Sequence, residues 1–522
     1  MRITNKVMQN NALSNINRNK IYQDDLNNQL ATGKRINRPS DDPVVAIRAL
    51  RLRTDVSQIN QYYEKNIPDA QHWLSLTETS IKTTISVIKD IVEQCEKGSS
   101  DTLQVSDRNK IIDNLKALRD EIYATGDADY AGRYIFTGYR TDTSLSFGKD
   151  VKQKEYSITE SFDINDLEKM SYIDSKALPD IAATASASLT VPPDTQVEPC
   201  EYTRFRVAYD ALDGSDPGKI QLVYREDSPA DVTPPYQKGD AFPYSVTVKD
   251  IGNPATMTTM GDVYDSVGPD EIVLVPSTGE LIFGTSALNA FTAAKGALNF
   301  TYQKSEWVPS DLRPEHYFYC ESTNDDNQPV IYNPDYLDNL DVSPDQRIEY
   351  QVGFDQTVQV NTYASDVFKH AIGRDVDEII DLSDQLLEVE ALEKKYKEEL
   401  DNALDGTPAK TEAQQKVDVA KKALTYLRDQ LQKRFSNYIT HSQGYLDDAN
   451  EAVTVTGSRA KRVELAENRL SEQQTTFKEL ASKNEDADAT EVAVQLSSAE
   501  VSYEAALMAT GKMIQTTLLN YL

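Results

Sequence analysis

The spacing of apolar residues divides the chain into three zones. Residues 1–149 and 373–522 carry apolar side chains three and four residues apart, the period of a helix, whereas residues 150–372 carry short runs that alternate with polar residues. The middle zone also holds most of the prolines. We therefore predict an α+β fold, in which both chain ends form a long antiparallel α-helical coiled-coil body. A β-rich domain, with one or two subdomains, is inserted between them.

The best-defined helical stripe begins after Ser40-Asp41-Asp42-Pro43. Asp42 is placed to cap the free backbone N–H groups, and Pro43 occupies the first helical position, where its missing N–H costs nothing. The apolar face repeats every 18 residues (Val45, Tyr63, Ile81), or 3.6 residues per turn, which predicts a straight helix as far as Cys95. Pro68 lies within this stripe, so we expect the helix to be kinked or split there.

The remaining elements are predicted from turn signals and local periodicity. A second helix follows Ser106 and stops at Gly126, and a short strand or hairpin lies within residues 129–139. Strands are predicted at residues 203–209, 220–224, 244–248, 271–275 and 297–302, with one more over 350–360. A helical hairpin of residues 376–400 and 411–440 turns at Asp405-Gly406-Thr407-Pro408, and a separate helix covers 446–480.

The two ends of the chain carry the stripes that we assign to assembly. The apolar positions of the last helix repeat every 11 residues, a period that suits a straight helix packed along another one. Asparagines dilute the N-terminal stripe, so we expect that segment to fold only on assembly. The predicted interface residues are Ile3, Val7, Leu13, Ile16, Tyr22, Leu26, Leu30, Val492, Leu496, Tyr503, Leu507, Ile514, Leu518 and Tyr521.

These patterns predict five segments. Residues 1–42 form an N-terminal assembly helix and linker, and residues 43–149 form the N-terminal half of the helical body. Residues 150–372 form the inserted domain. Residues 373–487 form the other half of the body, with an extra helical hairpin at about 375–440, and residues 488–522 form the C-terminal assembly helix.

Composition excludes several classes of function. The formal charge is −30, from 54 basic and 84 acidic residues, which disfavours binding to nucleic acid or to an anionic membrane. No apolar stretch approaches the roughly 20 residues of a membrane span, and the N-terminus lacks the apolar region of a cleaved signal peptide.

The sequence offers no constellation for chemistry. Cys95, Cys200 and Cys320 are odd in number and widely spaced, so we expect free buried thiols rather than disulfides or zinc ligands. No grouping of acid, base and nucleophile emerges. We predict no catalytic residue, no cofactor and no metal, and a protein that is not an enzyme.

Several motifs together resemble the flagellin superfamily. They are Met1-Arg2-Ile3, Leu30-Ala31-Thr32-Gly33-Lys34-Arg35-Ile36, Pro39-Ser40-Asp41-Asp42-Pro43, Gly132-Arg133-Tyr134-Ile135-Phe136-Thr137-Gly138-Tyr139, Gly457-Ser458-Arg459, Arg462-Val463-Glu464 and Leu518-Leu519-Asn520-Tyr521-Leu522. The resemblance covers residues 1–145 and 350–522. The hairpin at about 375–440 is longer than the family's usual connector.

The resemblance implies a self-assembling structural subunit of the bacterial flagellum that joins hook to filament. Its implied partners are further copies of itself, the first hook-associated protein, flagellin, and the flagellar export chaperone and export apparatus. The implied location is extracellular, reached through the flagellar export channel without a cleaved signal peptide.

Two alternative functions stay open. The first is flagellin itself, although Gly33-Lys34-Arg35-Ile36 and the ending Asn520-Tyr521-Leu522 favour the junction subunit within the resemblance. The second is a secreted adhesin or carbohydrate-active protein carried by the middle domain. That function needs paired carboxylates or stacked aromatic side chains, which the sequence alone does not reveal.

Overall fold

The contacts within the chain define two compact units. The computed structural model describes residues 5–100, 105–149, 154–173, 199–214, 216–228, 235–251, 263–293, 298–323, 328–337 and 346–519. The first unit comprises residues 1–71, 350–358 and 461–522, and the second comprises residues 72–349 and 359–460. Both ends of the chain therefore belong to the same unit.

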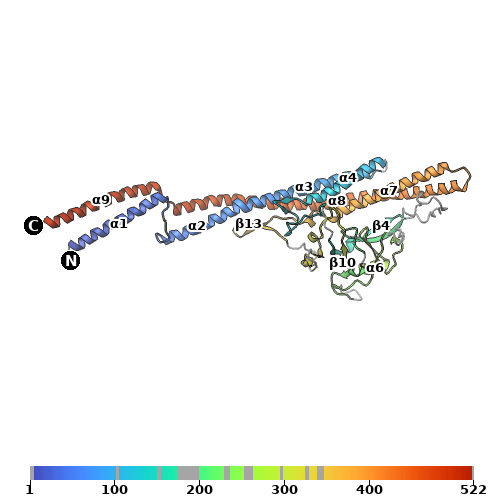
Figure 1. Ribbon diagram of the computed structural model, residues 1–522, viewed down its shortest axis with the longest axis horizontal. Coiled ribbons are helices and arrows are strands. Elements are labelled where there is room, and N and C mark those ends of the chain that lie inside the picture. Colours follow the sequence, from blue (N-terminus) through green and yellow to red (C-terminus); the bar gives the residue numbers. More distant parts are fainter. Residues whose placement is uncertain are drawn as a thin grey trace. The chain divides into compact units, whose positions relative to one another are not determined.

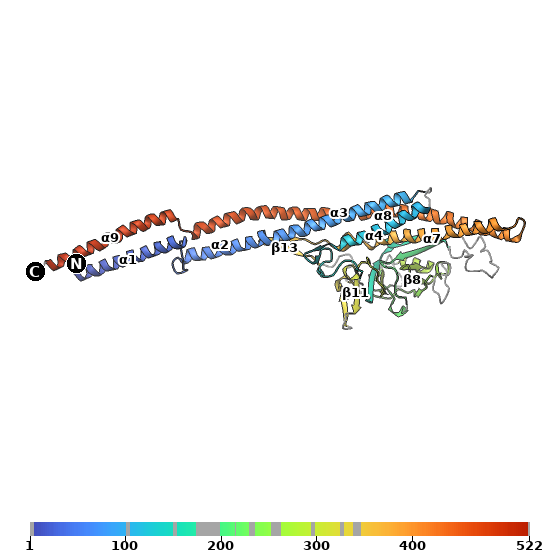
Figure 2. The same ribbon diagram turned by 45° about the horizontal axis from the view of Figure 1, so that its top comes forward.

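The first unit is built from antiparallel helices. Helices α1 (Asn5–Thr32) and α9 (Ala489–Leu519) lie side by side in both views (Figures 1 and 2). Helix α2 (Pro43–Gln61) packs along the end of α8 (Pro408–Glu485). Two hydrogen bonds join these helices, from the Asn484 amide to the Val45 carbonyl at 3.2 Å and from the Gln474 amide to Asn60 at 2.8 Å. The predicted pairing of the two chain ends as antiparallel helices is confirmed.

Pro68 splits the long N-terminal helix as the sequence predicts. A π-helical turn over Tyr62–Asn66 separates α2 from α3 (Ile67–Gly98), and the Ile67 N–H donates to the Tyr62 carbonyl five residues earlier. In a regular α-helix the proline at position 68 would lack an N–H for the Glu64 carbonyl, and its ring would clash there. The wider π-helical turn avoids both the missing hydrogen bond and the steric clash.

Residues 350–360 form two strands rather than the single predicted strand. Strands β13 (Glu349–Gly353) and β14 (Gln356–Gln359) form a two-stranded sheet, and Asp355 adopts a φ of 53° in the turn between them. Asp tolerates this left-handed conformation better than most residues, which allows a tight reversal after Gly353. The apolar–polar alternation continues through the turn and therefore concealed it.

Helix α8 is one continuous helix, where the sequence predicted two with a break between residues 440 and 446. A glycine inside a helix, such as Gly444, destabilises the helix by about 1 kcal/mol relative to alanine. The surrounding side chains offset this loss, because Tyr438, Ser442 and Ala449 are buried and the Ser442 hydroxyl donates to the Ile439 carbonyl at 2.7 Å.

The helices of the second unit pack in antiparallel pairs. Helix α7 (His370–Asn402) turns into α8 at Gly406, whose φ is +77°, and Lys416 on α8 reaches Glu399 on α7 at 3.0 Å. The predicted helical hairpin is therefore present. Helix α4 (Val105–Gly126) matches the second predicted helix and packs against α7. On α3 the predicted stripe is buried, including Leu74, Ile81 and Ile88.

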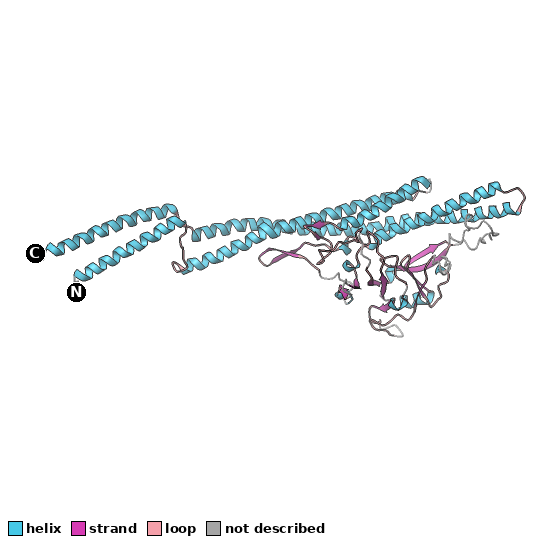
Figure 3. Cartoon of the chain, in the orientation of Figure 1, coloured by secondary structure: helices cyan, strands magenta, loops and turns pink. Residues whose placement is uncertain are grey.

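Among the described residues, the β-rich part of the second unit contains two five-stranded sheets. Its strands are drawn in magenta in Figure 3. The first has the order β12-β11-β3-β10-β6, from β3 (Tyr156–Phe162), β6 (Gln221–Tyr224), β10 (Leu298–Lys304), β11 (Tyr319–Thr323) and β12 (Pro329–Tyr332). The second has the order β4-β5-β9-β8-β7, from β4 (Glu168–Tyr172), β5 (Cys200–Arg206), β7 (Val246–Val248), β8 (Ile272–Val275) and β9 (Glu280–Phe283).

One hydrophobic core joins the two sheets. Phe205 of β5 and Phe300 of β10 belong to the same buried cluster, together with Phe291 of α6 (Thr285–Ala293). The second sheet is also covered on its other face, since Ile272 and Leu274 point into this core while Val273 and Val275 join a second cluster around Tyr264. This two-sided burial explains why β8 reads as an uninterrupted apolar run.

The predicted strands at 203–209, 220–224, 244–248, 271–275 and 297–302 correspond to β5, β6, β7, β8 and β10. Strands β3, β4, β9, β11 and β12 were not predicted. The predicted hairpin at 129–139 is present as β1 (Asp129–Tyr130) and β2 (Arg133–Tyr134).

The cysteines correct one expectation. Cys95 and Cys320 are buried free thiols, but Cys200 is only partly buried and its Sγ lies 2.5 Å from Oδ1 of Asp265. Within the described ranges no helix has an apolar stretch able to span a bilayer. No cluster of three His, Cys, Asp or Glu side chains suited to a metal ion occurs in those ranges.

Candidate assembly interface

Among the side chains that the structure describes, helices α1 and α9 bury a narrow seam between them. Leu26 on α1 packs against Val492 and Ala499 on α9, with Leu496 partly buried beside them. The Tyr22 hydroxyl donates to Oε1 of Gln495 at 3.3 Å, and the Ala487 N–H donates to the Gly33 carbonyl at 3.0 Å. Residue numbers therefore rise along α1 while they fall along α9, so the two helices are antiparallel. A pair of helices held by so few buried side chains leaves most of its surface available.

The structure brings together part of the predicted interface stripe. Ile16, Leu26 and Val492 are buried, and Leu496 and Tyr503 are partly buried. The other described members are exposed, and they are Val7, Leu13, Tyr22, Leu30 and Leu507. Ile3, Ile514, Leu518 and Tyr521 lie outside the residues whose side chains are described.

The linkers that precede α2 and α9 are joined by a short antiparallel bridge. The Arg35 N–H donates to the Glu485 carbonyl at 2.6 Å, and the Ala487 N–H donates to the Gly33 carbonyl at 3.0 Å. Gly33 has a φ of +66°, a conformation that favours glycine. The Gly33-Lys34-Arg35 motif therefore connects the end of α1 to the start of α9.

Charged side chains reinforce this bridge, and we call the set Lys34, Arg53, Glu485 and Asp486 the joint. Arg53 donates two hydrogen bonds of 2.6 Å to the buried Glu485 carboxylate, and Lys34 contacts Asp486 at 2.5 Å. The hydrogen bond from Arg53 lowers the pKa of Glu485, and the hydrogen bond to Asp486 raises the pKa of Lys34. Both shifts favour the charged forms that make the contacts.

Asp41 and Asp42 close the loop before α2. Asp42 Oδ1 accepts hydrogen bonds from the Val44 and Val45 N–H groups at 3.0 and 3.1 Å, and Pro43 occupies the first turn. Asp41 Oδ2 accepts from the Arg38 N–H at 2.8 Å, a hydrogen bond that lowers the Asp41 pKa. Both carboxylates thus serve backbone amides.

Comparisons with known proteins fit this arrangement. Residues 3–141 match the family described as the bacterial flagellin N-terminal helical region. Flagellar hook-associated protein 3 of Salmonella typhimurium is 31% identical over 145 residues, which are 28% of this chain and 45% of that protein. A flagellin of Clostridium tyrobutyricum is 30% identical over 122 residues, which are 23% of this chain and 32% of that flagellin.

Over residues 3–141 the chain is similar to the flagellin superfamily. The chain spans less than half the length of the curated relatives that it matches. A solved flagellar hook-associated protein of Vibrio parahaemolyticus aligns with 85% of this chain and 100% of its own, at 12% identity and a TM-score of 0.33. The similarity to the flagellin superfamily rests on the sequence matches and not on this alignment.

The structure also reveals candidate interface residues that the sequence did not predict. Val494, Val501 and Met508 on α9 are 67%, 67% and 68% exposed. They stand seven residues apart, and helical geometry places them opposite the Val492–Ala499 face that covers α1. On α2, Val44, Ile47 and Leu50 are likewise exposed. The seven-residue spacing was the available signal, but the stronger 11-residue stripe obscured it.

Arg53 and Glu485 were also missed. Nothing in the local sequence distinguishes them from other surface charges, because their pairing depends on residues 432 positions apart. The Gly33-Lys34-Arg35 motif was the only local sign that this loop has a fixed structure.

Proposed function

We propose that this chain is a structural subunit of the bacterial flagellum that joins the hook to the filament by self-assembly. The observation that carries the proposal is the pair α1 and α9, which belongs to a flagellin-superfamily chain and keeps large apolar side chains exposed. Exposed apolar surface of this kind marks sites of protein association. Repeating one contact between identical chains generates a helical or ring-shaped layer.

Similarity to flagellar hook-associated protein 3 supports the junction role rather than another flagellar role. The proposed partners are further copies of this chain, the first hook-associated protein and flagellin. An export chaperone and the flagellar export apparatus would deliver the chain to the outside without a cleaved signal peptide. By the same analogy, residues 150–372 form an outer domain, while residues 1–42 and 488–522 form the assembly helices.

Flagellin is the second candidate, because a flagellin is 30% identical to part of this chain. The two functions differ in how much protein each flagellum needs. A filament subunit dominates sheared extracellular material, whereas a junction subunit is scarce in it.

Immuno-electron microscopy tests the proposal directly. Antibodies against this chain should label only the boundary between hook and filament, and a deletion strain should make hooks without filaments. Label along the whole filament would instead identify the chain as flagellin. Label that is absent from the flagellum would refute both functions.

A further inference from the structure

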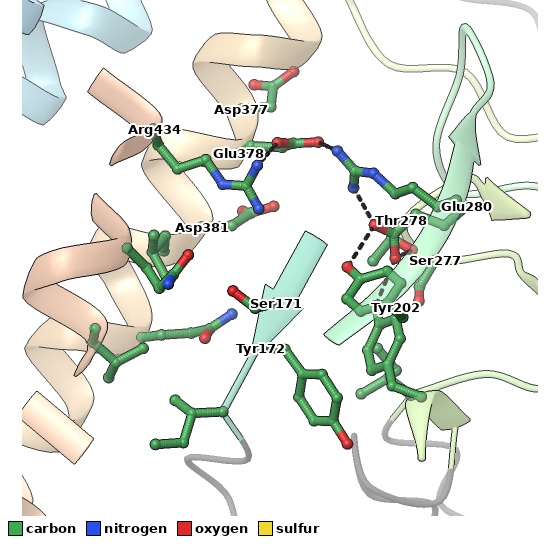
Figure 4. A pocket seen from close by; sticks show the side chains of 18 of the residues that line it. Ser171, Tyr172, Tyr202, Ser277, Thr278, Glu280, Asp377, Glu378, Asp381 and Arg434 are labelled. Carbon is green, nitrogen blue, oxygen red and sulfur yellow. Dashed lines mark hydrogen bonds and ion pairs between the residues drawn. The ribbon is translucent and has the colours of Figure 1, made fainter. Parts of the chain in front are cut away.

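The second unit contains a cavity between the helical hairpin and the second sheet. Its volume is about 160 Å³. Helix α7 contributes Asp381 and Gln385, α8 contributes Gln430 and Arg434, and β4 contributes Tyr172. Asp381, Arg434 and Tyr172 are labelled in Figure 4. The residues on α7 and α8 recur every four positions, so each helix presents one face to the same space.

One wall of the cavity is held by charges that satisfy each other. Arg204 is almost fully buried, donates to Glu168 Oε2 at 2.9 Å, and is also hydrogen-bonded to Glu280 and Glu378. Glu280 and Glu378 are labelled in Figure 4. Arg434 reaches the other oxygen of Glu378 at 3.3 Å. These groups need no ligand, and they fix the wall in place.

Other polar groups around the cavity lack partners. The Gln430 side chain is only 8% exposed and makes no hydrogen bond with any described residue. Nε of Arg374 is buried without an acceptor among the described residues, and Asp381 forms neither a hydrogen bond nor an ion pair with them. Folded proteins seldom leave a buried donor such as the Arg374 Nε unsatisfied, and the Gln430 amide lines the same cavity, so a bound molecule can pair with both groups.

These free groups indicate the chemistry of the ligand. They combine donors and acceptors, since an amide offers both, a carboxylate accepts and a guanidinium donates. Hydroxyl groups match such a set because each one donates and accepts. A simple cation would leave the Arg374 donor unmatched, and an anion would meet the carboxylates of Asp377, Glu378 and Asp381.

Aromatic rings complete the match. Tyr172, Tyr202 and Tyr264 pack together at the cavity, with ring centroids 4.5 to 6.1 Å apart. Aromatic rings beside a few oriented polar groups are typical of small-molecule sites. We propose that this cavity binds a single sugar ring, in a site carried by the inserted domain and the hairpin.

The proposal concerns binding of the sugar. Although burial alone would raise the pKa of Glu280 and of Glu378, Arg204 lowers both below the ordinary value of a glutamate. Both carboxylates therefore stay ionised and keep their ion pairs with Arg204, which hold this wall of the cavity.

Saturation-transfer-difference NMR on the full chain tests the proposal, with D-glucose, D-galactose and N-acetyl-D-glucosamine as probes and spermidine as a cationic comparison. We expect saturable binding of at least one sugar. Gln430→Leu and Asp381→Asn should each weaken that binding about tenfold or more, because the first removes an amide and the second replaces a charged acceptor oxygen by an N–H donor. Gln432→Leu is the matched control, since Gln432 is exposed on the same helix and does not line the cavity.

Several outcomes would overturn the proposal. They are the absence of binding for all three sugars, equal binding by the Gln430 and Gln432 variants, and binding of spermidine alone. If Gln430→Leu fails to fold, Asp381→Asn at the exposed side of the cavity decides the question. None of these results depends on the junction function, which electron microscopy tests separately.

Discussion

Arg53 holds Glu485 through two parallel hydrogen bonds of 2.6 Å, from Nε to Oε1 and from Nη2 to Oε2. The pair links α2 to the last residue of α8, whose carbonyl also accepts the Arg35 N–H. Bidentate pairs of arginine and carboxylate fix orientation as well as distance. The joint therefore sets the direction in which the chain leaves α8 and enters α9.

Replacing Arg53 should loosen the joint without unfolding the chain. Arg53→Gln removes the bidentate pair, and we expect a loss of about 1 kcal/mol in local stability, because Arg53 itself is largely exposed. The Arg35 and Ala487 amides should then exchange with deuterium faster. Arg51→Gln is the control, as Arg51 is exposed two residues away. Equal exchange in the two variants would show that the backbone bridge alone holds the joint.

A charge on the outer stripe of α9 should block assembly. Val501 is 67% exposed in the isolated chain, so Val501→Asp should leave the melting temperature of the monomer within a degree or so of the parent. In an assembled layer the same carboxylate would be buried without a partner, which costs several kcal/mol at every copy. Sedimentation of the purified protein under polymerising conditions should show monomer only.

Two further variants define which face assembles. Leu507→Asp should also prevent assembly if the predicted stripe contacts neighbouring subunits, because Leu507 lies at its exposed edge. Ser502→Asp adds the same charge at an exposed polar position on another face of α9 and should assemble normally. Normal motility of cells that carry Val501→Asp would show that the outer stripe is not an interface.

The ion pairs between the second sheet and the helical hairpin should contribute strongly to the stability of the second unit. Glu378 contacts Arg204, Arg206 and Arg434. Glu378→Gln leaves buried guanidinium groups with too few acceptors, so we expect a loss of about 3–5 kcal/mol in the free energy of unfolding. Urea denaturation measures this difference. The exposed Glu388 on the same helix provides the control, and Glu388→Gln should lie within about 0.5 kcal/mol of the parent.

Glu160 should make the stability of the second unit fall as pH rises. Burial raises the pKa of this carboxyl to about 7, although hydrogen bonds from Tyr302 and the Ala208 N–H oppose the shift. Between pH 4.5 and 7 the folded chain keeps the proton and the unfolded chain releases it. The stabilising contribution is therefore complete below pH 4.5 and is lost as pH rises to 7.

Glu160→Gln removes this titration. Between pH 5 and 8 the free energy of unfolding should fall by about 2 kcal/mol more in the parent than in the Glu160→Gln variant. Chemical denaturation at several pH values measures the two slopes. Glu226→Gln, at an exposed position, should retain the slope of the parent. Parallel slopes for the parent and Glu160→Gln would mean that Glu160 is already ionised in the folded chain at pH 5.

Features that depend on neighbouring residues could be predicted from the sequence. The cap at Asp42, the split at Pro68, the turn at Gly406 and the buried stripe of α3 all follow from local geometry and spacing. The missed strands β9 and β11 are short, and β9 is buried along its whole length. Strand β9 therefore carries little alternation to detect, because it is buried on both faces. Strand β11 does alternate in burial, but the polar Ser322 occupies one of its buried positions.

The sequence by itself determined that both chain ends are helical and that a strand-rich segment separates them. The periods of helix and strand can be recognised because they depend on residues that are close together in the sequence. Only the tertiary structure decided that α8 runs unbroken through Gly444 and that Arg53 meets Glu485. It also decided that Gln430 and Asp381 line one cavity and that Val501 remains exposed. These features depend on contacts between distant residues, and such contacts determine which side chains lose water on folding.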